Sequence, residues 1–143
     1  MDAQERARKV GETMFAVDIA SKDTMGMELL SVQPGRPKIR MAVKALHLNG
    51  HQICHGGFIF TLADSAFAFA CNGHGPRAVA AQCHISYLKP TRLGDRLVAN
   101  AREVVRRQVR LGDDFLHERQ SRLEEPVERR QADDHGIETR IEI

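Results

Sequence analysis

The sequence predicts an α+β domain in which an antiparallel sheet surrounds one central helix. The stretch "CHGGFIFTLADSAFAFACNGHG", residues 54–75, is strongly apolar and contains four of the six phenylalanines, which favours a buried helix. The segments around it carry strand patterns separated by turns rich in proline and glycine. Runs of strands around a single helix indicate an α+β fold, and 143 residues are enough for one domain with one core.

The elements before the central helix follow from spacing. Residues 3–15 place four apolar side chains at helical intervals, so we predict a short helix there. Two strands follow, "MELLSVQ" (27–33) and "KIRMAVKAL" (38–46), separated by the turn "PGRP". The second strand alternates, which assigns one face to Ile39, Met41, Val43 and Ala45 and the other to Lys38, Arg40 and Lys44.

Two more strands are predicted after the central helix. "AVAAQCHISYL" (78–88) alternates and assigns one face to Val79, Ala81, Cys83, Ile85 and Tyr87. "RLVANAREVV" (96–105) follows the turn "KPTRLGD". The strand order along the chain is therefore two strands, a buried helix and two strands.

The last third of the chain has a different composition. Residues 102–143 hold 9 basic and 11 acidic side chains and show almost no period-two alternation. We predict a domain over residues 1–101 and a charged segment over 102–143 that either joins this domain or is disordered. The abrupt change also suggests a shift of reading frame at the gene level, which would leave the central helix intact.

The composition also excludes several kinds of partner. The net charge of +2, with both signs spread along the chain, gives no case for nucleic acid. The longest apolar segment, residues 58–71, is too short to span a membrane. Three cysteines without a Cys-x-x-Cys pair, and an N-terminus without an apolar signal core, predict a protein of the reducing cytoplasm.

Asp64 is the unusual residue of the central helix. Over residues 58–71 only Thr61, Asp64 and Ser65 are polar, and their spacing puts them on one stripe. An ionised carboxylate among apolar side chains costs several kcal/mol unless it is hydrogen-bonded or its pKa rises. Thr61 and Ser65 are its nearest candidate partners. Asp64 is either a structural acid at a helix interface or a catalytic group.

Gly56 and Gly57 precede this helix and suggest an oxyanion site. The first turn of a helix has N–H groups without intrahelical partners, and glycine allows a close approach to them. The alternative is a simple glycine turn. Gly56 and Asp64 are eight residues apart, about 12 Å along a helix, so they cannot serve one reacting carbon within one subunit. Two antiparallel helices across a two-fold axis would bring them together.

The motif "LNGHQICHGGFIFTLADSAFAFACN", followed by "AVAAQCHISYLKPTRLGD", resembles the hotdog-fold acyl-CoA thioesterases of the PaaI group, over roughly residues 8–101. The resemblance implies a curved antiparallel sheet wrapped around a long helix, assembled as dimers and commonly tetramers. It implies hydrolysis of phenylacetyl-CoA or hydroxyphenylacetyl-CoA without a cofactor. The family's acid falls on Asp64, its oxyanion-hole glycine on Gly56 or Gly57, and its asparagine on Asn49.

Other residues have two interpretations each. Asn49 either forms a hydrogen bond to the attacking water or to Asp64, or only stabilises a turn. His55 either donates a hydrogen bond to the thioester or orients the two glycines. Lys89, Arg92 and Arg96 either contact coenzyme A phosphates or form a solvated turn. Thr61 and Ser65 are also candidates for substrate binding. Phe67, Phe69 and Tyr87 border an aryl pocket or pack in the core.

Two further readings are open. His51, Cys54 and His55 are residue types that bind zinc, but no fourth ligand is evident, so we predict no metal. The alternative to a thioesterase is a non-catalytic acyl-CoA-binding or dehydratase-like hotdog module. A hydratase of this fold is expected to pair a histidine with an acid in a different motif.

Overall fold

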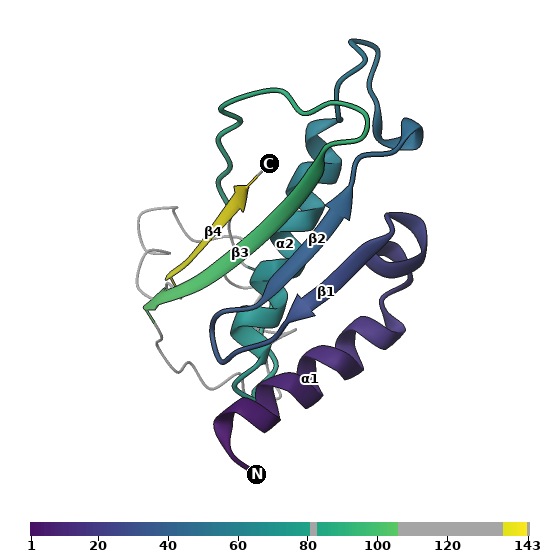
Figure 1. Cartoon of the computed structure of the whole chain (residues 1–143). Coiled ribbons are helices and arrows are strands. Elements are labelled where there is room, and N and C mark those ends of the chain that lie inside the picture. Colours follow the sequence, from purple (N-terminus) through teal and green to yellow (C-terminus); the bar gives the residue numbers. More distant parts are fainter. Residues whose placement is uncertain (81–82, 106–135, 143) are drawn as a thin grey trace, which may run out of the picture. The chain divides into compact units, whose positions relative to one another are not determined.

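A computed structural model describes residues 1–80, 83–105 and 136–142 of the chain (Figure 1). The chain divides into two compact units, Met1–Glu103 with Ile137–Ile143, and Val104–Gly136. Of the second unit only residues 104, 105 and 136 are described. The site discussed below lies entirely in the first unit.

The chain begins with helix α1 (Ala3–Val17), as predicted. Asp2 caps it, because its side chain accepts a hydrogen bond from the backbone N–H of Glu5 (2.7 Å). Ala7 and Gly11 face inward, and a Cβ at Gly11 would lie 2.7 Å from Val32, so the helix approaches that residue closely. A π-helical turn, η1 (Ala20–Thr24), leads into the first strand.

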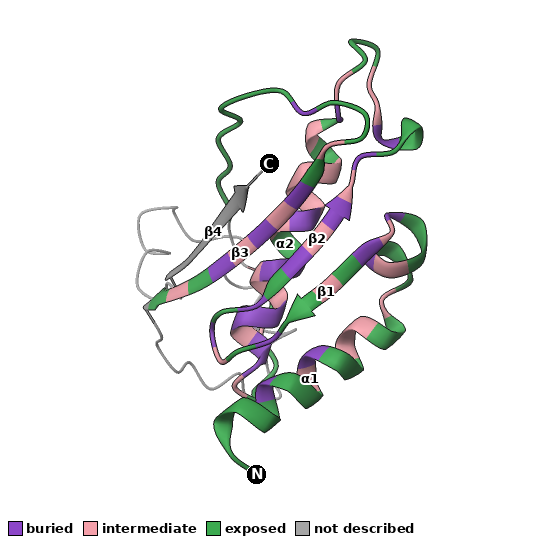
Figure 2. Ribbon diagram, in the orientation of Figure 1, coloured by how far each residue is buried: buried purple, intermediate pink, exposed green. Residues whose placement is uncertain are grey.

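One sheet has the strand order β1-β2-β3-β4. The strands are β1 (Met27–Ser31), β2 (Lys38–Ala42), β3 (Arg96–Val105) and β4 (Gly136–Glu142). β1 pairs antiparallel with β2, and β2 with β3, with Met27 opposite Met41 and Ile39 opposite Ala99. Buried residues alternate along β2 and β3, which confirms the predicted face of Ile39 and Met41 (Figure 2).

Helix α2 (Gly56–Asn72) packs against this sheet and contacts α1 and β2 (Figure 1). Leu62, Ala66, Phe69 and Ala70 point into the core, where they meet the buried residues of the strands. Phe15 of α1 lies edge-on to Phe69, with ring centroids 6.2 Å apart. The predicted buried helix is confirmed, and it fixes the position of Asp64 and the two glycines.

The predicted strand over residues 78–88 is wrong for the described part of this segment. Residues 78–80 and 83–88 are not in a strand, and Val79, Cys83, Ile85 and Tyr87 are exposed. A strand needs a neighbour for its backbone hydrogen bonds, and the described residues of this segment are not part of the sheet formed by β1 to β4. Of the charged segment, residues 106–135 lie outside the described residues, and 136–142 form β4.

Candidate active site

The segment that leads into α2 folds back on itself. A 3₁₀ turn, η2 (Ala45–His47), is followed by a bridge between Leu48 and Cys54 that closes a short loop. The Asn49 side-chain oxygen accepts hydrogen bonds from the N–H groups of His51 (2.9 Å) and Ile53 (3.4 Å). The turn interpretation of Asn49 therefore holds for its oxygen, and its amide nitrogen has no partner among the described residues.

His47 is buried next to this loop and contacts residues on both sides of it. Its side chain is fully buried, its Nδ1 accepts from the Lys44 N–H (3.0 Å), and its ring packs on Phe58 with centroids 4.8 Å apart. Burial, and secondly the charge of Lys44, lower the pKa of His47. The backbone oxygen of His47 accepts from the N–H of His55 (2.8 Å), so His47 holds the residue directly before α2.

His55 caps α2 and distinguishes the two glycines. Its Nδ1 accepts from the Gly57 N–H (3.0 Å), and its carbonyl accepts from the Phe58 N–H (3.0 Å). The Gly56 N–H, in contrast, has no hydrogen-bond partner in the described part of the chain. Because the Gly57 donor is occupied, Gly56 is the better candidate for an oxyanion donor.

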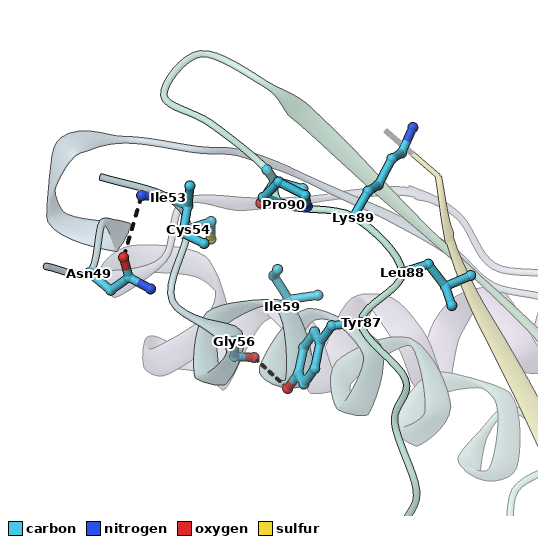
Figure 3. A pocket seen from close by; sticks show the side chains of 10 residues that line it. Asn49, Ile53, Cys54, Gly56, Ile59, Tyr87, Leu88, Lys89 and Pro90 are labelled. Atoms are coloured by element: carbon cyan, nitrogen blue, oxygen red, sulfur yellow. Dashed lines mark hydrogen bonds between the residues drawn. The ribbon is translucent and has the colours of Figure 1, made fainter. Parts of the chain in front are cut away.

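A pocket of about 390 Å³ opens beside this helix end (Figure 3). It is lined by Asn49, Ile53, Cys54, Gly56, Ile59, Tyr87, Leu88, Lys89, Pro90 and Thr91. The Thr91 carbonyl accepts from the Cys54 N–H (2.8 Å) and ties the two walls together. Figure 3 shows the free amide nitrogen of Asn49 on the pocket side of its loop. The walls are mostly apolar, and they include Asn49 and Gly56, each of which has an N–H donor without a partner among the described residues.

Asp64 lies outside this pocket. Its side chain is exposed on α2 in the single chain, yet neighbouring apolar groups desolvate it enough to raise its pKa. It is eight residues from Gly56 in one continuous helix, a rise of about 12 Å. The structure therefore keeps the two groups apart within one chain. An acid with a raised pKa is a stronger base than an ordinary aspartate.

Two predicted partners of Asp64 bind elsewhere. The Thr61 hydroxyl donates to the Gly57 carbonyl (2.9 Å), and the Ser65 hydroxyl is bonded to that of Ser21 (2.9 Å). Thr61 and Ser65 do not line the pocket either. Consecutive residues of a helix point in different directions, so Ser65 faces the core while Asp64 is exposed.

The three basic residues predicted to contact coenzyme A do not all lie at the pocket. Lys89 lines the pocket, and Figure 3 shows its amino group pointing away from the pocket centre. Arg92 and Arg96 are exposed and do not line the pocket. The backbone N–H of Arg92 is bound to the Asp95 carboxylate (2.7 Å), so this part is a structured turn.

The cysteines and the zinc candidates give no second centre. Burial raises the pKa of the Cys54 thiol, and burial also raises that of Cys71 to about 11, so neither thiol supplies a thiolate near neutral pH. Among the described residues, no three His, Cys, Asp or Glu side chains are grouped to hold a metal ion. No helix in the described part of the chain is long and apolar enough to cross a membrane.

Sequence reasoning missed several pocket residues. Ile53, Cys54, Ile59, Leu88, Pro90 and Thr91 line the pocket. Ile53 and Ile59 look like ordinary core residues in the sequence, and Thr91 looks like part of a turn. Only the folding of residues 87–91 beside the helix end brings these groups together, and no local pattern signals that approach.

The chain is similar to thioesterases in sequence and in fold. The model of the thioesterase superfamily matches residues 51–111. The chain is 44% identical over 96 residues to acyl-coenzyme A thioesterase PaaI of Escherichia coli K12, covering 67% of this chain and 68% of that protein. It is 45% identical over 82 residues to a putative esterase of Archaeoglobus fulgidus, covering 57% of this chain and 53% of that protein.

Solved structures agree in fold. The E. coli PaaI protein from the phenylacetic acid degradation operon has a TM-score of 0.72 at 39% identity, covering 75% of this chain and 77% of that one. A hypothetical thioesterase from Streptococcus pneumoniae TIGR4, solved with coenzyme A, has a TM-score of 0.61 at 27% identity, covering 67% and 74%. The α+β arrangement of a helix against an antiparallel sheet is the hotdog fold of these proteins.

Proposed function

Because this chain belongs to the PaaI-type acyl-CoA thioesterases, we propose that it hydrolyses aryl-acetyl thioesters of coenzyme A, with phenylacetyl-CoA or hydroxyphenylacetyl-CoA as its substrate. The chain is a thioester hydrolase by family. The observation that carries the proposal is the Gly56 N–H, which has no partner among the described residues and belongs to a residue that starts α2 and lines the pocket.

The reaction needs a donor where negative charge develops. When water attacks the thioester carbonyl, the carbonyl oxygen becomes an oxyanion, and the Gly56 N–H with the positive end of the α2 dipole stabilises it. The side-chain amide of Asn49, which also lines the pocket, is a second donor for the oxyanion or for the attacking water. Collapse of the tetrahedral intermediate breaks the C–S bond and releases the acid and the coenzyme A thiol.

The reaction also needs an acid–base group, and Asp64 of the partner subunit fits this role. A carboxylate either removes a proton from water or attacks the carbonyl carbon to form an anhydride that water then hydrolyses. Since Gly56 and Asp64 of one chain are about 12 Å apart, the proposal requires a homodimer with shared sites. Pairs of such dimers form the proposed homotetramer, which light scattering of the purified protein would test.

The acyl group is proposed from the relative and from the pocket. The E. coli protein belongs to a phenylacetic acid degradation operon. In this chain Ile53, Ile59 and Tyr87 provide an apolar wall suited to an aromatic ring. Lys89, at the pocket edge, is the residue best placed to meet a coenzyme A phosphate.

A substrate panel tests the proposal. The purified protein is assayed for thiol release from phenylacetyl-, hydroxyphenylacetyl-, benzoyl- and short straight-chain CoA thioesters. We expect the highest kcat/KM for the two aryl-acetyl thioesters. Equal rates for the straight-chain compounds would reduce the assignment to a general acyl-CoA thioesterase. Binding of CoA thioesters without turnover would favour the non-catalytic module instead.

A further inference from the structure

Tyr87 makes an unusual contact with the start of α2. Its hydroxyl donates a hydrogen bond to the Gly56 carbonyl (3.0 Å), across 31 positions of sequence (Figure 3). Both residues line the pocket. Tyr87 comes from the segment 83–88, which has no strand partner, and its side chain is 53% exposed. This contact therefore ties a segment that forms no strand to the helix end.

The ring of Tyr87 also crowds the position that a side chain at residue 56 would occupy. Gly56 is not among the residues with positive φ, so its backbone does not require glycine. A Cβ at position 56 would lie 3.0 Å from the Tyr87 Cζ and 3.1 Å from its hydroxyl oxygen. A side chain at position 56 would therefore require the Tyr87 ring to shift by a few tenths of an ångström.

The peptide between Gly56 and Gly57 is held at both ends. Tyr87 binds its carbonyl oxygen (3.0 Å), and the Nδ1 of His55 accepts from its N–H (3.0 Å). With that peptide fixed, Gly56 keeps one free polar group, its own N–H. The Tyr87 ring also lies against Gly56, within van der Waals reach of the position of a Cβ.

We propose that Tyr87 is a positioning residue for the oxyanion donor: it holds the Gly56–Gly57 peptide by its hydroxyl and packs its ring on Gly56, so that the Gly56 N–H faces the thioester carbonyl. This inference rests on the proposed thioesterase function. Tyr87 acts through Gly56 and takes no part in proton transfer. The hydroxyl sets the orientation of the peptide, and the ring packs beside Gly56.

Kinetics of Tyr87→Phe test the role of the hydroxyl. This variant keeps the ring and removes only the bond to the Gly56 carbonyl. We expect kcat for phenylacetyl-CoA to fall about tenfold, with KM changed less than about twofold and an unchanged melting temperature, because misplacing a donor weakens transition-state binding selectively. Ser86→Ala, which removes an exposed hydroxyl from the neighbouring position, is the matched control and should keep wild-type kcat. A Tyr87→Phe enzyme with wild-type kcat would overturn the positioning role of the hydroxyl.

A double-mutant cycle tests the ring without any assay of activity. Gly56→Ala should lower the melting temperature when Tyr87 is present and lower it much less in the Tyr87→Ala background, since the clash is then removed. Additive effects of the two substitutions would contradict the contact. If Gly56→Ala fails to fold, recovery of a folded Gly56→Ala/Tyr87→Ala protein supports the proposal, and failure of both speaks against it.

A binding experiment separates this inference from the proposed function. The probe is a dethia analogue of phenylacetyl-CoA, in which CH₂ replaces sulfur, titrated into ¹⁵N-labelled protein. We expect the Gly56 amide resonance to shift on binding, and the shift to shrink in Tyr87→Phe. Absent turnover in the wild-type protein would defeat the proposed function alone. An equal Gly56 shift in both proteins would defeat the role of Tyr87 whether or not the protein is an enzyme.

Discussion

The hydroxyl groups of Ser21 and Ser65 form a buried hydrogen bond, with their oxygens 2.9 Å apart and both side chains less than 8% exposed. Ser21 lies in η1, and Ser65 follows Asp64 in α2. Together with the buried apolar side chains of α2, this bond holds the helix in one orientation about its axis. Ser65 is held toward the core, and Asp64 is thereby held on the outer face, where a second subunit can meet it.

Removing either hydroxyl should therefore reduce stability. Ser65→Ala leaves the Ser21 hydroxyl buried without a partner, and Ser21→Ala does the converse, so each should lower the free energy of unfolding by about 1–3 kcal/mol. The double variant should lose less than the sum, because no unpaired hydroxyl remains. Urea unfolding measures these changes, with Ser31→Ala, at an exposed position, as the control. Additive losses would show that the bond contributes nothing of its own.

His47 should make stability fall in acid. Burial lowers its pKa in the folded protein below the ordinary value near 6.5. The unfolded chain then binds a proton at His47 more readily than the folded protein does. The contribution of the neutral His47 to stability is therefore complete above about pH 6.5, and it is lost as the pH falls from there through the folded pKa. His47→Asn, which keeps an acceptor for the Lys44 N–H, should flatten the dependence of unfolding free energy on pH in this range.

The control for His47 is His51→Asn at an exposed imidazole. Both variants are unfolded with urea at several pH values between about 5 and 8. The same slope in wild type and His47→Asn would mean that other groups cause the acid sensitivity. A ¹⁵N spectrum of the histidine rings identifies directly whether His47 stays neutral in the folded protein.

Local periodicity predicted much of the fold, and contacts between distant segments decided the rest. Residues 96–105 were assigned as a strand from their pattern, and β3 has those bounds. Residues 78–88 have an equally good pattern but form no strand where described, because a strand depends on a neighbour and not on its own alternation. The pattern cannot supply that neighbour.

The same limit applies to the candidate site. The apolar helix and its single acid were evident from the sequence, and so was the distance that separates Gly56 from Asp64. The sequence did not distinguish Gly56 from Gly57 as the oxyanion donor, because that choice depends on the His55 ring accepting a hydrogen bond from the Gly57 N–H. Likewise the direction of Ser65 depends on Ser21, 44 positions away, and no sequence signal connects them.

Mixing two inactive variants tests the shared site. A subunit with Asp64→Ala keeps its oxyanion donor, and a subunit with Gly56→Pro, which lacks the backbone N–H at this first helical position, keeps its acid. If each site takes Gly56 from one chain and Asp64 from the other, a mixed dimer contains one intact site out of two. Activity absent from both parents should appear after subunit exchange. No gain in a mixture whose exchange is confirmed by mass spectrometry would contradict the shared site.

Asp64→Asn tests the acid directly. The amide keeps the shape of the side chain but cannot accept a proton as a base, so kcat should fall by at least ~10²-fold with KM nearly unchanged. Stability should change in the opposite sense. The pKa of Asp64 is raised by desolvation, so in the folded protein the carboxyl binds its proton more tightly than in the unfolded chain. Its ionisation therefore costs stability as pH rises from below about 3.9 through the folded pKa.

Above that range Asp64→Asn should be at least as stable as wild type, because the cost of the desolvated charge is removed. Thermal unfolding and kcat of the same variant thus separate two roles. Asp23→Asn, at an exposed carboxylate of η1, is the control and should preserve kcat. A folded Asp64→Asn enzyme that turns over within a few-fold of wild type would make Asp64 a structural acid, and the reaction would then need another base near the Gly56 donor.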